Sequence, residues 1–436
     1  MPRRLNAADA GFEAEFRGLL AAKREVSVDV NDTVATILAE VRQRGDEAVI
    51  EYTERFDRVK LTPETMRFTA TEIEAAVAAC GKDTLAALDV AAERIQSFHE
   101  KQKPADLAYT DEAGVRLGQR WTAVGAAGLY VPGGTAAYPS SVLMNAIPAR
   151  VAGVERRVMV VPTPDGVVNP LVLAAAHLAG VTEIYRIGGA QAVAALAYGT
   201  DTVAPVDKVV GPGNAWVAEA KRQVFGIVGI DMIAGPSEIL VVADAENDAG
   251  WIAMDLLSQA EHDESAQSIL ITDDADFAGQ VERAMEGHLK TLPRAAIAGK
   301  SWADFGAVIL VDALADAVSL VDRIAPEHLE LAVADPETLS TRVRNAGAIF
   351  LGRYTPEAIG DYVAGPNHVL PTARSARFSS GLGVLDFMKR TTTVACDADS
   401  LARIGPAAVT LAETEGLDAH AASVAIRLNT GRRDGE

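Results

Sequence analysis

The run EILVVAD at residues 238–244, followed by SILIT at 268–272 and AVILV at 307–311, decides the fold class. These runs are short, continuously apolar and rich in β-branched residues, and helical segments separate them. Strands that are apolar on both faces are typical of parallel sheets with helices on either side. Further runs of this kind are RVMVVP (157–162), EIYRI (183–187), KVV (208–210) and AIFL (348–351). The sequence therefore predicts an α/β protein, and two helical interruptions between clusters of runs predict two α/β modules.

Helices are expected at both ends of the chain. The segment NDTVATILAEVRQRGDEAVIEYTERF (31–56) has apolar residues at helical spacing, with Asn31 and Asp32 as candidate N-caps. A second helical segment begins near residue 69 and is stopped by Pro104. From about residue 397 the pattern is again helical, and it ends in a polar tail.

Composition excludes several classes of function. Of the 436 residues, 49% are apolar and 23% charged, so the chain is globular and long enough for two or three domains. A net charge of −20 disfavours binding to nucleic acid, and no apolar stretch is long enough to span a membrane. The chain has two cysteines and no signal-peptide pattern, so we expect a cytoplasmic protein whose metal ligands, if any, are nitrogen and oxygen atoms.

Two glycine-rich turns follow strand-like runs and precede helices. They are IGGAQAVAALAYG (187–199) and VVGPGNAWVAEAKRQVF (209–225). The free N–H groups of a helix N-terminus suit a pyrophosphate, so both turns are candidate nucleotide sites. The second lacks the third glycine of the dinucleotide fingerprint, because Trp216 takes its place, and Asp231 heads a turn instead of ending a strand. Tight turns in any α/β protein would give the same pattern.

Three segments carry residues that suit a metal ion. Gln259 and His262 are three residues apart on a predicted helix and project from one face. Asp361 follows a glycine in a predicted loop, and His420 lies on the polar side of a predicted amphipathic helix. If these four converge, they form a nitrogen and oxygen site with room for substrate, for which zinc is the natural ion. Taken separately, they also fit a polar helix face, a capping aspartate and a surface histidine.

Glu327 and His328, in RIAPEHLELAV (323–333), are a candidate acid–base pair. They follow Pro326 at what has the pattern of a helix start, where adjacent side chains diverge by ~100°. Such a pair reaches one substrate from two directions, and histidine titrates near neutral pH, as a general base must. A helix N-terminus with a favourable glutamate and an incidental histidine explains the same residues.

Eight segments together resemble the histidinol dehydrogenase family. They are GLYVPGGTAAYPSSVLMNAIPARVAGV (128–154), GPGNAWV (211–217), IDMIAGPSEILVVAD (230–244), SQAEHD (258–263), APEHLEL (325–331), GDYVAGPNHVLPT (360–372), ARFSSGL (376–382) and EGLDAHAASVAIR (415–427). The resemblance runs from about residue 95 to 428, and motifs of this length in this order are specific.

The resemblance implies an architecture as well as a class. The fold would comprise two incomplete Rossmann-like modules with parallel-rich sheets, N-terminal helices and a C-terminal helical tail. The implied division is an N-terminal helical arm (1–24), a discontinuous main α/β domain with the substrate and metal site (25–129 plus 237–382), an NAD-binding α/β module (130–236) and a C-terminal tail (383–436) that reaches the partner subunit.

Site residues follow from the resemblance by motif position. The ligands of one zinc ion per subunit would be Gln259, His262, Asp361 and His420. The substrate would be held by these ligands together with Ser237, His328 and Glu415. The NAD-contacting positions would be Tyr130, Gln191 and Asn214.

Enzymes of this family oxidise L-histidinol to L-histidine through histidinaldehyde, with two NAD+, in the last step of histidine biosynthesis. The resemblance implies that zinc orients the substrate, that His328 is the general base and that Glu327 activates water. It also implies a homodimer with shared active sites, in which Glu415 and His420 act in the neighbouring subunit. No nucleic acid or membrane partner is expected.

Three other functions remain open at this point. A paralogue of the same scaffold would use NAD and zinc to oxidise another small polar alcohol, such as a sulfonated diol. A metal-dependent hydrolase or lyase would have no nicotinamide cofactor. A binding protein without activity is disfavoured, because every implied catalytic position carries a competent side chain.

Overall fold

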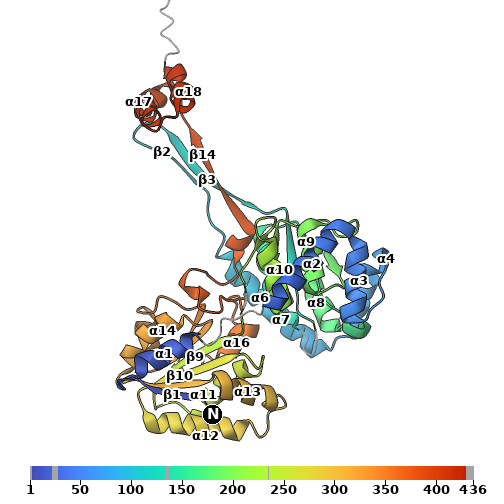
Figure 1. Cartoon of the computed structure of the whole chain (residues 1–436), viewed down its shortest axis with the longest axis vertical. Coiled ribbons are helices and arrows are strands. Elements are labelled where there is room, and N and C mark those ends of the chain that lie inside the picture. Colours follow the sequence, from blue (N-terminus) through green and yellow to red (C-terminus); the bar gives the residue numbers. More distant parts are fainter. Residues whose placement is uncertain (1, 22–27, 134–137, 234, 429–436) are drawn as a thin grey trace, which may run out of the picture. The chain divides into compact units, whose positions relative to one another are not determined.

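The computed structural model describes residues 2–21, 28–133, 138–233 and 235–428 (Figure 1). They form two compact units: one is Met1–Gln102 with Gly125–Phe387, and the other is Lys103–Val124 with Met388–Glu436. The first unit contains two parallel sheets and the second a small antiparallel sheet. The α/β class with parallel-rich sheets and terminal helices is thus confirmed. The predicted boundary at residue 24 and the tail after residue 428 lie outside the described residues.

The larger sheet has six parallel strands in the order β1-β11-β10-β9-β12-β13. They are β1 (Arg3–Asn6), β9 (Glu238–Ala243), β10 (Gln267–Thr272), β11 (Ala307–Leu310), β12 (His328–Ala332) and β13 (Ala348–Leu351). Alternate residues of β9 enter two separate cores, since Leu240 and Val242 pack with Phe16 on one face, whereas Ile239 and Val241 pack with Trp302 on the other. Burial on both faces explains why β9, β10 and β11 read as continuous apolar runs.

Helices cover both faces of this sheet. One face packs against α1 (Phe12–Ala21) and α14 (Ala317–Ile324). The other packs against α11 (Ala249–Ala260), α12 (Ala275–His288) and α13 (Ala295–Phe305).

The smaller sheet has five parallel strands in the order β6-β5-β4-β7-β8. They are β4 (Ala126–Tyr130), β5 (Arg156–Val160), β6 (Glu183–Tyr185), β7 (Lys208–Val210) and β8 (Gly229–Ile230). Numbered along the chain, the spatial order is third, second, first, fourth, fifth, which is the order of a doubly wound nucleotide-binding half. The direction of winding therefore reverses between β4 and β7, where such folds bind their ligands beyond the carboxyl ends of the strands.

One face of the smaller sheet is covered by α2 (Val28–Arg44), α3 (Asp46–Asp57), α9 (Gly189–Tyr198) and α10 (Ala215–Val224). On the other side lie α7 (Pro139–Ala152) and α8 (Pro170–Leu178), with α5 (Ala70–Ala79) and α6 (Lys82–Glu100) packed against them. The short α4 (Pro63–Met66) places Met66 in the core. No helix in the described part of the chain is both long and apolar enough to cross a bilayer.

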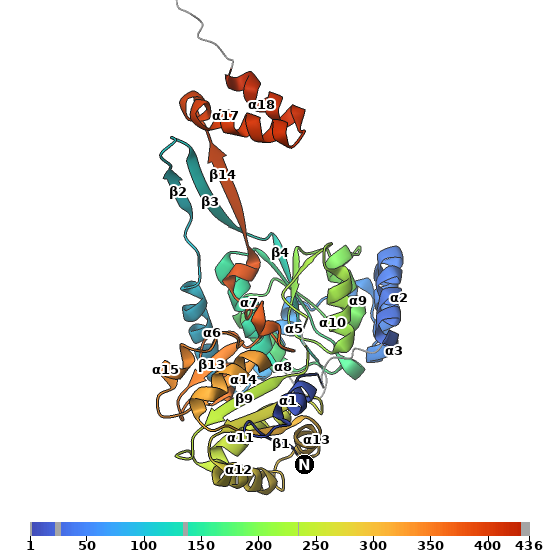
Figure 2. The ribbon, with the colours of Figure 1, turned by 60° about the vertical axis from the view of Figure 1, so that its left-hand side comes forward.

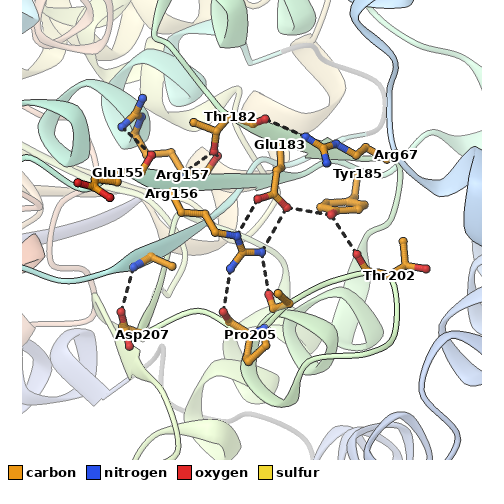
Figure 3. A network of polar contacts seen from close by, with 12 residues as sticks. Arg67, Glu155, Arg156, Arg157, Thr182, Glu183, Tyr185, Thr202, Pro205 and Asp207 are labelled. Carbon is orange, nitrogen blue, oxygen red and sulfur yellow. Dashed lines mark hydrogen bonds and ion pairs between the residues drawn. The ribbon is translucent and has the colours of Figure 1, made fainter.

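A polar network ties β5 to β6 and to the loop after α9 (Figure 3). Arg156 donates to Glu183 and to the carbonyl oxygens of Ala204 and Pro205. The hydroxyl of Tyr185 donates to Oε2 of Glu183 at 2.9 Å, and the same oxygen also accepts from Arg156 at 3.2 Å. Burial alone would raise the pKa of Glu183, but the hydrogen bonds from Arg156 and Tyr185 outweigh it and lower the pKa.

The second unit consists of three antiparallel strands in the order β14-β3-β2 and a pair of helices (Figure 2). The strands are β2 (Leu107–Thr110), β3 (Arg116–Ala123) and β14 (Met388–Ala395), and the helices are α17 (Ala398–Thr414) and α18 (Asp418–Leu428). The two helices pack closely at Gly405, where an added Cβ would lie 3.0 Å from Leu428. The predicted C-terminal helices are therefore confirmed.

Several local predictions were wrong. Asn31 and Asp32 do not cap a helix, because α2 begins at Val28 and the helical segment breaks at Gly45. The segment predicted as one helix from residue 69 is broken at Cys80–Gly81 into α5 and α6. The segment at Glu327 and His328 is not a helix start, since His328 opens strand β12, whose neighbours on both sides supply its backbone hydrogen bonds.

Two segments of the chain pack against partners that are distant in the sequence. Helices α2 and α3 lie within the segment expected in the main domain, yet they share a core with the smaller sheet. Residues 103–124, expected in the same domain, pair instead with β14 in the second unit. In both cases the apolar faces find their partners far along the chain, which sequence patterns do not reveal.

Candidate active site

Two neighbouring strands of the larger sheet position the candidate base. His328 lies beside Ile239 where β12 pairs with β9, and it is 3% exposed. Its Nδ1 is 3.0 Å from the carbonyl oxygen of Glu238. Because a carbonyl oxygen can only accept, Nδ1 carries the proton and Nε2 has the free lone pair. Burial lowers the pKa of His328, which keeps the ring neutral and able to take a proton.

Glu327 precedes His328 but faces a different partner. Its Oε2 accepts a hydrogen bond of 2.9 Å from the backbone N–H of Glu238. Burial raises the pKa of Glu327 well above its ordinary value, and the carboxylates of Glu238, Asp361 and Glu357 raise it further. A carboxylate with a raised pKa is a stronger base, so this group suits the activation of water.

A short helix, α16 (Glu357–Tyr362), brings two more carboxylates to His328. Glu357 and Asp361 are four residues apart and therefore share a face of the helix. The Nε2 of His328 is 3.6 Å from Oε1 of Glu357, and ligand atoms of these three residues lie within 4.8 Å of one another. Burial and the charge of Asp361 raise the pKa of Glu357 to about 9. Asp361 was predicted in a loop, and its place in a helix corrects that prediction.

His368 completes the group around Asp361. Its Nδ1 is 3.0 Å from the Asp361 carbonyl oxygen and 3.7 Å from the carboxylate Oδ1. Its Nε2 lies 3.3 Å from the hydroxyl of Ser141 on α7. Burial lowers the pKa of His368.

Gln259 and His262 come from the end of α11. The helix ends at Ala260, so His262 lies in the following turn and not on the predicted helix face. Gln259 is 1% exposed, and its Oε1 has no hydrogen-bond partner among the described residues. His262 is close enough to His328 and His368 for its charge to lower the pKa of both.

The first unit therefore brings His328 and Asp361 together, His262 lies within electrostatic range of His328, and Gln259 is three residues before His262. Ser237 lies next to Glu238 at the start of β9. Glu415 and His420 belong to the second unit, where Glu415 caps α17, His420 lies in α18 and both are exposed.

The predicted NAD-contacting residues lie at the carboxyl ends of strands and the helix starts of the smaller sheet. Tyr130 ends β4 and its hydroxyl accepts a 3.0 Å bond from the N–H of Gly189. Gln191 is the third residue of α9 and 1% exposed, with no partner for its Oε1 within the described ranges. The Oδ1 of Asn214 caps α10 by accepting from two backbone N–H groups, so a ligand would meet its Nδ2.

Two residues of the site escaped prediction. Glu357 is buried, with ligand atoms within 4.8 Å of those of His328 and Asp361, and His368, whose side chain is 13% exposed, has its Nδ1 3.7 Å from the Asp361 carboxylate. The spacing of Glu357 and Asp361 was a usable signal, because an acidic pair at i and i+4 is unfavourable on a helix without a compensating role.

The side chains present fit a zinc ion. Nitrogen from His262 and oxygen from Asp361 are ordinary zinc ligands. The buried amide oxygen of Gln259, which no described residue satisfies, would gain a partner from a bound cation.

Comparison with known proteins identifies the family of the chain. The family model for histidinol dehydrogenase matches residues 20–428. A histidinol dehydrogenase from Rhodospirillum rubrum is 70% identical over 99% of this chain and 100% of its own length. A histidinol dehydrogenase from Ruegeria pomeroyi is 66% identical over 98% of this chain and 99% of its own length. The crystal structure of histidinol dehydrogenase from Elizabethkingia anophelis superimposes with a TM-score of 0.94 at 35% identity, covering 98% of both chains.

The fold and site thus define an oxidoreductase, an NAD-dependent dehydrogenase of the α/β class. More particularly, the chain belongs to the histidinol dehydrogenase family, whose reaction is the oxidation of histidinol in histidine biosynthesis.

Proposed function

We propose that this protein oxidises L-histidinol to L-histidine in two successive steps through histidinaldehyde, consuming two NAD+. The observation that carries the proposal is the orientation of His328. Its Nδ1 is fixed on the Glu238 carbonyl, so the lone pair of Nε2 is directed toward Glu357 and Asp361. A buried neutral imidazole held in one tautomer is the group that an alcohol oxidation needs.

His328 takes the hydroxyl proton of histidinol at Nε2 in the first oxidation. In the second, Glu327 takes a proton from water as the water adds to the aldehyde. Two different bases suit two different protons, because the alcohol and the water approach one carbon at successive stages. Bound NAD+ supplies the hydride acceptor for both oxidations.

Gln259, His262 and Asp361, with His420, would hold the zinc ion. When bound, zinc supplies a positive charge that anchors the imidazole and amino nitrogens of the substrate. Ser237, His328 and Glu415 would complete the contacts with substrate. Tyr130, Gln191 and Asn214 would contact NAD at the carboxyl edge of the smaller sheet.

The remaining assignments are part of the same proposal. The functional protein would be a cytoplasmic homodimer in which the C-terminal tail from residue 383 supplies Glu415 and His420 to the neighbouring subunit. The module of residues 130–236 would bind NAD, and residues 237–382 would provide most of the substrate and metal site.

The stoichiometry of NADH formed per L-histidinol consumed tests the proposal. Protein loaded with zinc should give two NADH, and treatment with a chelator should abolish the activity until zinc is restored. One NADH per substrate would instead indicate a simple alcohol dehydrogenase in which Glu327 has no role. Absence of NADH with both zinc-loaded and stripped protein would overturn the proposed reaction.

A further inference from the structure

Asp57 is a buried carboxylate at the nucleotide-binding edge of the smaller sheet. It is the last residue of α3 and is 9% exposed. Its Oδ2 has no hydrogen-bond partner among the described residues. A buried carboxylate oxygen without a hydrogen-bond partner costs free energy unless a ligand satisfies it.

A second unsatisfied group lies beside this carboxylate. The backbone N–H of Thr163 bonds to Asp57, and the side chain of Thr163 is 2% exposed with no described partner for Oγ1. Burial raises the pKa of Asp57. Burial also raises the pKa of Tyr130 to about 12, and the charge of Asp57 adds to that rise, so the carboxylate lies within electrostatic range of the tyrosine ring.

The place of this pair in the sheet indicates a ligand. Thr163 follows β5, which is the second strand of the doubly wound order. In such folds an acid near the end of the second strand hydrogen-bonds the ribose of the dinucleotide. The acid that the sequence itself supplies there is Asp165, but Arg58 binds both of its carboxylate oxygens at 2.6 and 2.5 Å. Asp57 comes from an earlier part of the chain, and its Oδ2 is still available to accept a hydrogen bond from a ribose hydroxyl.

Close packing brings two further loops to the same edge. An added Cβ at Gly133 would lie 2.6 Å from Pro162, and one at Gly188 would lie 2.4 Å from the same proline. The loops after β4 and β6 therefore both approach the turn that carries Thr163, and they do so where only glycine fits.

We propose that Asp57 and Thr163 bind the ribose hydroxyl groups of NAD and exclude NADP. The carboxylate accepts from the vicinal diol, and the threonine hydroxyl adds a further hydrogen bond. A 2′-phosphate would bring negative charge against a buried carboxylate, so discrimination comes from repulsion as well as from lost hydrogen bonds. This inference rests on the proposed function, because it assigns a cofactor contact to the same NAD site.

The test compares Asp57→Asn, Thr163→Val and the control Glu54→Gln in the full-length, zinc-loaded protein. Glu54 is an exposed carboxylate one turn earlier on α3, so its loss removes the same charge from the same helix. We expect Asp57→Asn to raise the KM for NAD+ by about 10-fold or more and to narrow the preference for NAD+ over NADP+. The KM for L-histidinol should stay the same, as should all constants of the control.

Titration calorimetry with ADP-ribose and its 2′-phosphate gives a readout that does not depend on turnover. Wild-type protein should bind ADP-ribose more tightly than its 2′-phosphate. Both Asp57→Asn and Thr163→Val should weaken the binding of ADP-ribose. If Asp57→Asn does not fold, Thr163→Val decides the question. Unchanged affinity for ADP-ribose in the folded variants would overturn the inference alone, whereas a wild-type protein that neither binds ADP-ribose nor reduces NAD+ would overturn the proposed function.

Discussion

Lys221 of α10 and Asp231, which follows β8, form a buried ion pair that holds the backbone of Gly211 from both sides. The Nζ of Lys221 donates to the Gly211 carbonyl oxygen at 3.0 Å, and Oδ2 of Asp231 accepts from its N–H at 2.7 Å. The two side chains are 2% and 1% exposed. Gly211 has φ +111°, and a Cβ there would lie 2.1 Å from the Tyr130 carbonyl oxygen. The pair therefore fixes the turn that begins GPGN.

Breaking this pair should destabilise the protein strongly. Lys221→Met leaves the Asp231 carboxylate buried without its cation, and we expect a loss of about 3–5 kcal/mol in the free energy of unfolding. Urea titration measures it. Arg17→Met, which removes an exposed pair with Glu13, is the control and should cost less than about 1 kcal/mol. A similar small loss for both variants would show that Lys221 has no such role.

The network around Glu183 should make stability depend on pH. Since the folded pKa of Glu183 lies below its ordinary value of 4.5, its contribution is present above that pH and is lost as pH falls through the folded pKa. Glu183→Gln should therefore lower the free energy of unfolding by about 1.5–3 kcal/mol at pH 7 and by less at pH 3. Denaturant titrations at both values measure the difference. The control is Glu155→Gln, which alters an exposed neighbour in Figure 3. If Glu183→Gln lowers the free energy of unfolding as much at pH 3 as at pH 7, the prediction is contradicted.

Loss of the imidazole at residue 328 should abolish most of the activity. We expect His328→Asn to lower kcat with L-histidinol by about 10²–10⁴-fold, because no general base remains for the hydroxyl proton. Steady-state NADH formation measures it, and the melting temperature shows whether the variant is folded. His177→Asn, on the exposed side of α8, should have wild-type activity. If the folded His328→Asn enzyme has a kcat within a few-fold of the wild-type value, His328 is not the general base.

Replacement of Glu327 should separate the two oxidations. Glutamine can still accept from the N–H of Glu238, so Glu327→Gln preserves the local hydrogen bond while removing the base. The expected product is one NADH per histidinol, with histidinaldehyde accumulating and trapped by an added hydrazine. Two NADH per substrate at the wild-type rate would show that another group activates water.

Mixing subunits tests whether the active sites are shared. If His420 acts in the neighbouring subunit, a heterodimer of His420→Ala and His328→Ala has one intact site. Random mixing should then restore about a quarter of the wild-type activity. A mixture of His262→Ala and His328→Ala, both altered in the first unit, should restore none. Equal recovery in both mixtures, or none in verified heterodimers of the first, would argue against shared sites.

Strands of the two parallel sheets were predictable where burial on both faces requires a continuous run of apolar residues. Strands β1, β4 and β12 lack that signal for physical reasons. β1, with the sequence RRLN, is an edge strand whose charged residues face solvent, and β4 is built of alanine and glycine. β12 follows a proline, which reads as a helix start but equally begins a strand after a turn.

The candidate site was partly predictable. His328 was identified from its residue type and neighbour, but its tautomer depends on the Glu238 carbonyl of an adjacent strand. Glu357 lies 29 positions beyond His328 in the sequence (357 − 328), and its raised pKa arises only where burial and Asp361 meet. Asp57 is still further from the other NAD residues along the chain. The sequence shows which side chains are chemically suitable, but only the fold shows which of them lie close together.

The pairing of β1 with β11 has a consequence for synthesis of the chain. Arg3–Asn6 adds to the edge of the larger sheet only along Ala307–Leu310. During translation the first strand therefore emerges from the ribosome long before its partner does, and its backbone groups stay hydrated until residue 310 has been made. The smaller sheet, complete by Ile230, has no such delay and is free to fold while translation continues. The nascent protein is thus expected to assemble from its middle outward, with its own beginning docking among the last.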